Sequence, residues 1–211
     1  MRSGNNLHQI AVAIHQYQAT YGHLPPAAVR GKDGRPLLSW RVLLLPFLEQ
    51  NELYTEFHLD EPWDSPHNQP LLQKMPRVYA AVGAGKGASA DATFYQVFTG
   101  KGTAFETDGL VVPKDFPDGP ENTILVIEAG QAVPWTQPAD MLYLAEGPLP
   151  ELGGVFKGPT RFSNWNQVAG MNAAFADGSL HFLKQPIQEE RLRGLITRNG
   201  GERVNPEDST N

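Results

Sequence analysis

The sequence predicts an α+β fold, in which a long N-terminal helix packs on an antiparallel β-sheet and a shorter helix follows near the C-terminus. Three observations carry this prediction. They are an amphipathic stretch at 5–21, a continuous apolar run at 123–129, and a hairpin signal around Asp177 and Gly178. A chain of 211 residues is compatible with one domain, which is the organisation that we expect.

Five parts are expected along this single domain, in chain order. They are a helical spine (5–22), a helical insertion (37–75), a β-sheet region with long loops (76–184), a C-terminal helix (187–200) and a polar tail (205–211).

The spine is predicted from the sequence NNLHQIAVAIHQYQATY. Its large apolar side chains recur at steps of three and four, which places them on one stripe of a helix. These side chains are Leu7, Ile10, Ile14, Tyr17 and Tyr21. Gly22 and the prolines at 25–26 end the pattern. We expect the stripe to be buried and the rest of the chain to cover it.

The insertion is predicted to contain several short helices after a polar loop at 27–37. Ser39 can cap a helix over 40–48, and Pro46 should break that helix near Leu45. Further short helices are expected over 51–57 and 67–74.

Strand patterns begin after Pro76, with candidates at 77–82 and 93–98. The run TILVIEA at 123–129 is rich in β-branched residues and has no polar alternation, which indicates a central strand covered on both faces. Residues 133–154 contain many prolines and glycines and are predicted to form a long surface loop.

The hairpin signal is NAAFADGSLHFLK, in which Asp177-Gly178 fits a two-residue type I′ turn. Such a turn would place Phe175 opposite Leu180, and we expect the resulting apolar face to lie on the N-terminal helix. The face consists of Met171, Ala173, Phe175, Leu180 and Phe182. The C-terminal helix should turn Leu192, Leu195 and Ile196 inward.

Composition excludes some classes of function. The net charge is −6 without a basic patch, so a nucleic acid is not an expected partner. No apolar run reaches the ~18 residues of a membrane span. Cysteine is absent, which excludes disulfides and thiolate metal sites.

Four separated motifs resemble, in this order, a planctomycete prepilin-like family of unknown function. They are NNLHQIAVAIHQYQATYGHLPPA, LSWRVLLLPFLEQNELY, NTILVIEAG and FADGSLHFL, and the resemblance runs from about Asn5 to Gly201. Members have a prepilin-type N-terminal segment and a C-terminal signature of His, nine residues, then Asp-Gly. They are also grouped with bacterial extracellular solute-binding proteins. Here Gln167 occupies the position of the signature His, and the family's hydrophobic half-helix before the spine is not in the sequence.

The resemblance implies a pilin-like or pseudopilin-like fold and an exported protein, periplasmic or at the cell surface. The full-length form would be membrane-anchored, with protein partners or self-assembly through the preceding segment. Two functions remain open: a non-enzymatic structural, assembly or surface-display protein, and an extracellular solute- or glycan-binding domain on the same scaffold. An enzyme is disfavoured, because the sequence has no nucleophile–base motif and no full set of metal ligands.

An acidic cluster in the insertion could hold calcium through oxygen ligands. It consists of Glu56, Asp60, Glu61 and Asp64. The phrase EPWDSPHN is loosely similar to a stretch beside a calcium site in the major type II secretion pseudopilin. The favoured alternative is a solvated acidic turn in which Asp64 caps a helix, and this alternative needs no cofactor.

Three tryptophans in loops rich in proline and asparagine could meet a ligand or a partner. They are Trp63, Trp135 and Trp165, and Asn164, Asn166 and Gln167 would add hydrogen bonds suited to a sugar. The favoured alternative is that these rings anchor long loops on the core. Glu128, at the end of the buried strand, is expected to find a backbone amide or an arginine such as Arg41 or Arg161.

Overall fold

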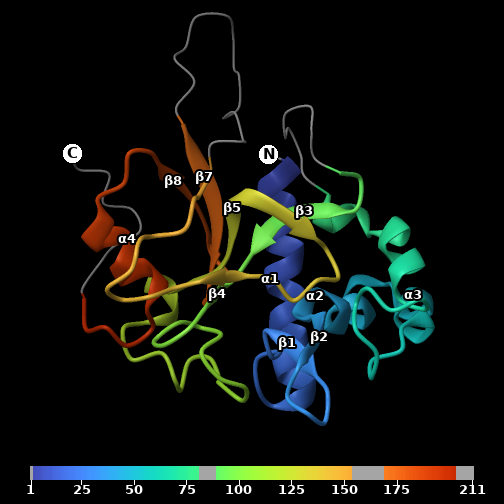
Figure 1. Cartoon of the computed structure of the whole chain (residues 1–211). Helices are drawn as coiled ribbons and strands as arrows, with labels where there is room; N and C mark the ends of the chain where they lie inside the picture. Colours follow the sequence, from blue (N-terminus) through green and yellow to red (C-terminus); the bar gives the residue numbers. More distant parts are fainter. Residues whose placement is uncertain (1, 81–88, 154–168, 203–211) are drawn as a thin grey trace, which may run out of the picture.

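The computed structural model describes residues 2–80, 89–153 and 169–202. Helix α1 (Arg2–Tyr21) packs on a four-stranded antiparallel sheet with the order β3-β5-β7-β8 (Figure 1). The strands are β3 (Ala92–Gln96), β5 (Ile124–Pro134), β7 (Gly170–Phe175) and β8 (Leu180–Lys184). The predicted α+β architecture is therefore confirmed.

The apolar stripe of α1 is buried as the periodicity predicts, except at its last position. Leu7, Ile10 and Ile14 have no exposed surface, and Tyr17 is also buried. Tyr21 contradicts the expectation, because 55% of it is exposed. It lies in the last turn of the helix, where its ring contacts Tyr17 and Phe47 at the edge of the core.

The sheet separates two hydrophobic cores. One core joins the stripe of α1 to Tyr95 of β3 and to Trp40. The other joins the opposite face of the sheet to helix α4 (Glu189–Ile196), which is shorter than the predicted span. Its inward residues are Leu192, Leu195 and Ile196, as the sequence indicates. In Figure 1 strands β7 and β8 lie between α4 and α1.

Strand β5 is the central strand that the apolar run predicts. It pairs with β3 on one side and with β7 on the other, and residues 124–129 are buried. The strand continues to Pro134, five residues beyond the run, with partly exposed side chains. The two covered faces explain why a polar alternation is missing from its sequence.

The β7–β8 hairpin exists, but its register differs by one residue from the prediction. Ala174, not Phe175, faces Leu180. The Gly178 amide donates to the Phe175 carbonyl and Gly178 has φ +87°, so the loop has three residues with glycine in the left-handed position. The Asp177 carboxylate accepts the amide of Ser179 and closes the turn.

This shift moves the hairpin's apolar side chains to different faces. Met171, Ala173 and Phe175 lie in the core beside α4 and not on α1. Leu180 and Phe182 take the other face and remain 38% and 39% exposed. The prediction that these five side chains share one face that packs on the N-terminal helix is therefore wrong.

The segment before β3 is a series of short elements, and two predictions there are wrong. The polar loop contains an antiparallel hairpin, β1 (Ala28–Arg30) and β2 (Pro36–Ser39), and the strand expected from Arg77 is a 3₁₀ helix over Arg77–Tyr79. The helical elements are α2 (Trp40–Leu43), α3 (Asn51–Glu56) and the 3₁₀ helices η1 (Leu45–Leu48), η2 (Gln69–Lys74) and η3 (Arg77–Tyr79). The Ser39 cap and the break at Pro46 are confirmed.

The region between β3 and β7 contains the remaining short elements. Strand β4 (Phe98–Thr99) pairs in parallel with β6 (Met141–Leu142), and η4 (Pro120–Asn122) precedes β5. Within the described ranges, no helix combines the length and the apolar character that spanning a membrane requires.

His15 connects α1 to the tip of the β7–β8 hairpin. Its Nε2 atom is buried and has no hydrogen-bond partner among the described residues, and Gly178 lies against the ring. Burial lowers the pKa of His15 below its ordinary 6.5, and the nearby Asp177 carboxylate opposes this shift only in part. The folded protein therefore favours the neutral imidazole.

We expect the contribution of His15 to reduce the free energy of unfolding as the pH falls below 6.5. In that range the unfolded chain binds a proton at His15 that the folded chain still excludes, so acid favours unfolding. Urea denaturation at about pH 7.5 and about pH 5.5 should show a smaller acid loss for His15→Gln than for the wild type. His8→Gln, at an exposed position of the same helix, is the control. An unchanged acid loss in His15→Gln would contradict the prediction.

Candidate functional site

The three tryptophans are not brought together. Trp135 is 0% exposed, its Nε1 donates to the Leu72 carbonyl at 3.0 Å, and its ring stacks on Tyr79. It therefore anchors its loop to the core, and the prediction that it meets a ligand is wrong. Trp63 is partly buried against the same core.

The remaining members of the predicted contact group are Trp165, Asn164, Asn166 and Gln167, and they lie outside the described residues. Because Trp63 is partly buried and Trp135 fully buried, the described part of the chain shows no cluster of exposed loop tryptophans that could contact a ligand.

The acidic cluster does not assemble a metal site in the structure. Glu56 pairs with Lys74, and Glu61 accepts from His58 at 2.9 Å, while Asp60 and Asp64 are exposed. In the described ranges no three His, Asp or Glu side chains converge as metal ligands would.

The physical reason is the buried Asn68 at the centre of this loop. Its Nδ2 is within hydrogen-bond distance of the carbonyls of His58, Glu61 and Pro62, and its Oδ1 accepts the amide of His58. The loop backbone therefore closes around one amide side chain, and the carboxylates project outward.

Asp140 is the carboxylate that Arg41 binds, at the centre of a buried polar group. The Arg41 Nη2 and Asp140 Oδ1 atoms are 2.7 Å apart, with side chains 0% and 2% exposed. Trp40 Nε1 and the Val97 amide also donate to Asp140. The Arg41 guanidinium also donates to the carbonyl of Tyr95 and to Ser39 Oγ. Almost every polar atom of the Arg41 and Asp140 side chains therefore has a hydrogen-bond partner.

Of the two kinds of partner expected for Glu128, the structure shows the backbone amide, that of Asn172, and no arginine among the described residues. Ser3 of α1 donates to its Oε1, and the backbone amide and side chain of Asn172 donate to its carboxylate at 2.7–3.0 Å. Tyr95 joins the same group through Ser3 at 2.8 Å. Burial raises the pKa of Tyr95, while the hydrogen bonds that its hydroxyl shares with Ser3 and Asn6 lower it in part. This group fixes the first turn of α1 on the central strand.

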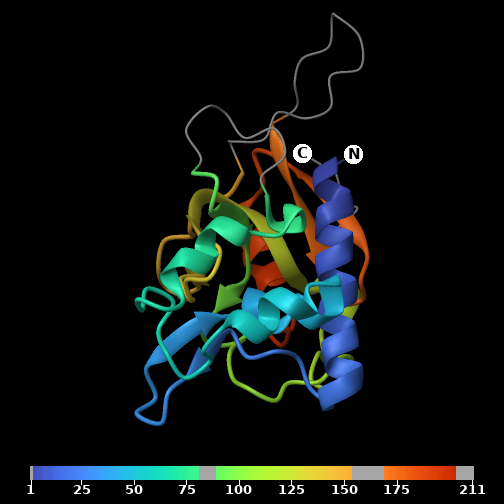
Figure 2. The same ribbon diagram turned by 90° about the vertical axis from the view of Figure 1, so that its right-hand side faces the viewer.

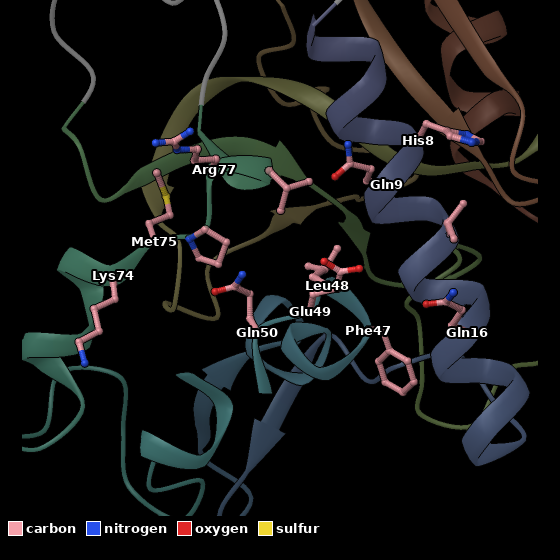
Figure 3. Close-up of a pocket in the computed structure, with 13 residues that line it drawn as sticks. His8, Gln9, Gln16, Phe47, Leu48, Glu49, Gln50, Lys74, Met75 and Arg77 are labelled. Carbon is pink, nitrogen blue, oxygen red and sulfur yellow. The ribbon is translucent and has the colours of Figure 1, made fainter. Parts of the chain in front are cut away.

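A groove of about 810 Å³ lies between the outer face of α1 and the short helices of the insertion (Figure 3). No strand contributes to its walls. The lining side chains come from three segments, which are residues 8, 9, 12 and 16 of α1, residues 47–50, and residues 74–78.

Four polar side chains of this groove have no polar partner among the described residues. Gln9, Gln16, Gln50 and Arg77 make no side-chain hydrogen bond or ion pair with the described residues. Figure 3 shows Gln9 and Gln50 facing each other across the opening, whereas His8 points away from it. The apolar part of the lining includes Phe47, Met75 and Val78. Free hydrogen-bonding groups around an apolar floor are typical of a ligand site.

Glu49, also in the groove, has φ 59° and ψ 29° and is the only non-glycine residue with a positive φ in the described part of the chain. An L-residue in this left-handed region costs about 1–2 kcal/mol. Such backbone strain is concentrated at functional sites.

We expect Glu49→Gly to raise the free energy of unfolding by up to ~1 kcal/mol. The strain that it relieves exceeds the ~0.5–1 kcal/mol of extra chain entropy that glycine loses on folding. Glu52→Gly, three positions on and inside α3, should instead lower it by about 1 kcal/mol. Urea denaturation of both variants checks the difference in sign.

Sequence reasoning missed the groove, although one signal was visible. Gln9 and Gln16 are seven residues apart with Val12 between them, on the side of the helix away from the apolar stripe. This spacing defines a second face of the helix, and Val12 is 40% exposed on it.

Comparison with known proteins gives a match to a family model. No curated protein and no solved structure matches the chain. Residues 1–82 match the model of a family described as protein of unknown function (DUF1559), which also carries the solute-binding label SBP_bac_10. The matched stretch includes α1 and every residue that lines the groove. The N-terminal part of this chain is thus similar to a family of unknown function that is also grouped as solute-binding.

Proposed function

We propose that this chain is the globular part of an exported, non-enzymatic, pseudopilin-like protein that serves in assembly or surface display. One observation carries the proposal: α1 buries a single stripe on one face of an antiparallel sheet, and its opposite side is exposed at the edge of the molecule (Figure 2). This is the arrangement that the resemblance to prepilin-like proteins implies.

In this proposal the protein is periplasmic or at the cell surface, and a hydrophobic segment before α1 anchors the full-length form. The solute-binding label of the matched family supports an extracellular location. The partners are other proteins or further copies of the chain, which meet α1 along its exposed side. Gln9, Val12 and Gln16 lie on that side.

Cysteine cross-linking of the full-length gene product tests the assembly proposal. The 211 residues contain no cysteine, so each introduced thiol is the only one within them. We expect Gln16→Cys to give disulfide-linked dimers in the cell envelope. The matched control is Lys32→Cys, on the exposed turn between β1 and β2, which lies far from α1 in Figure 2. Equal cross-linking of the two variants, or a protein that fractionates only with the cytosol, would contradict the proposal.

A second candidate function is extracellular solute or glycan binding on the same scaffold. The groove favours it, because its glutamines and Arg77 make no side-chain hydrogen bond or ion pair with the described residues. Melting-temperature shifts with a panel of sugars, amino acids and peptides test this function, since a ligand that binds the folded state raises the melting temperature. A panel that leaves the melting temperature unchanged would remove the support for it.

A further inference from the structure

We propose that the groove binds an acidic oligosaccharide, a carbohydrate chain with carboxylate or sulfate groups. This inference rests on the second proposed function and names the class of its ligand.

The glutamines of the groove fit a ligand with many hydroxyl groups. Each amide offers two donors and an acceptor with two lone pairs, as a vicinal pair of hydroxyls requires. Gln9 and Gln16 are about 10 Å apart along the helix axis, at 1.5 Å per residue. Gln50 faces them from the opposite wall (Figure 3). The contacts therefore extend beyond a single sugar ring.

The charged side chains of the groove favour an acidic ligand and indicate at which end its acidic group lies. Arg77 has no ion pair within the described residues, and Lys74 has only the solvent-exposed Glu56 as a partner, a type of pair that contributes little. A guanidinium binds carboxylate or sulfate through two parallel hydrogen bonds. Glu49 lies on the other wall. Its carboxylate disfavours an anionic group of the ligand there and can accept hydrogen bonds from hydroxyl groups. The acidic group of the ligand accordingly lies at the Arg77 end.

An aromatic surface continues the groove at its opposite end. Phe47 lines the groove, and the ring of Tyr21 lies 6.2 Å from it between centroids. Tyr21 is 55% exposed although it is held by Phe47 and by Tyr17 at 4.5 Å. An ordered, exposed ring with an apolar face and a hydroxyl suits the C–H face of a sugar.

The walls favour a carbohydrate over an extended peptide. Peptides that add to a protein as strands pair with the free edge of a sheet, and none of the described residues that line the groove belongs to a strand. The hydrogen bonds on offer are therefore those of side chains, which match hydroxyls and acidic groups.

Calorimetric titration of the full chain tests the inference with three probes of equal length: an oligogalacturonate, a sulfated heparin oligosaccharide and a neutral cello-oligosaccharide. We expect at least one acidic probe to bind, more weakly at higher salt, and the neutral probe to bind at least about tenfold more weakly. Arg77→Gln should reduce the affinity for the acidic probe by about tenfold or more, and Tyr21→Ala should also reduce it. The matched control is Arg35→Gln, at an exposed arginine on the β1–β2 turn, which should leave the affinity unchanged.

Three results would overturn the inference. Equal binding of neutral and acidic probes, or no effect of Arg77→Gln in a variant with the wild-type melting temperature, would refute the acidic ligand and leave solute binding in place. Binding of none of the three probes would refute a carbohydrate ligand of these types. The broader melting panel would then decide whether solute binding itself fails.

Discussion

Replacing Asp140 with alanine is expected to lower the free energy of unfolding by about 3–5 kcal/mol, because it leaves a buried guanidinium without its counter-charge. Arg41 has no exposed surface, and Asp140 is its only carboxylate partner in the described residues. The same change removes acceptors from Trp40 Nε1 and from the Val97 amide. Urea denaturation monitored by tryptophan fluorescence measures the loss.

The exposed pair Asp33–Arg35 gives the matched control, because its side chains are mostly in solvent. We expect Asp33→Ala to be indistinguishable from the wild type in the same assay. The double variant Arg41→Met/Asp140→Leu should recover much of the loss, since replacing both charges with apolar side chains avoids an unpaired buried charge. An equal loss in Asp140→Ala and Asp33→Ala would show that the pair does not restrain the core.

Replacing Ile14 with alanine is expected to cost about 2–5 kcal/mol of unfolding free energy. Ile14 is completely buried where α1 meets the sheet, in the core that also contains Trp40 and Tyr95. Alanine would leave a cavity under a helix that forms one wall of this core. Chemical denaturation of the purified chain measures the change.

Val12→Ala is the control on the same helix, because Val12 is 40% exposed and its truncation should cost under about 1 kcal/mol. A loss below about half a kcal/mol in Ile14→Ala would mean that α1 is not docked in solution. The proposed use of its outer side for assembly would then lose its basis.

The elements that the sequence predicted well are those whose pattern is long and repeated. Four of the five stripe residues of α1 are buried, and the apolar run of β5 is the central strand. Both patterns report burial on a whole face, which many residues determine together. Tyr21 departs because it lies beyond the part of the helix that the core covers.

Features that depend on one or two residues were not predictable in the same way. The β7–β8 loop could have two or three residues with the same Asp-Gly sequence, and the extra residue exchanges the two faces of β8. Strand β1 has only three residues, too few to show an alternation. Trp135 lies in a loop rich in proline, yet tertiary contacts bury it completely.

The candidate site could be predicted only in part. The groove needs three segments that are spread over residues 8–78, and no local motif indicates that residues 47–50 and 74–78 lie beside α1. The left-handed conformation of Glu49 is also invisible in the sequence, because glutamate rarely adopts it. The repeated glutamines on the outer face of α1 are the one feature of the groove that the sequence indicates.

The link from Ser3 to Glu128 has a mechanical consequence. A pulling force applied to the start of α1 would act on Ser3. The hydrogen bond from Ser3 to Glu128 would transmit this force to β5, which pairs with a strand on each side. Because α1 lies along the sheet, such a pull loads many contacts in shear at once and does not peel them apart one by one. A pull on the first helical turn would thus be shared by many contacts between α1 and the sheet.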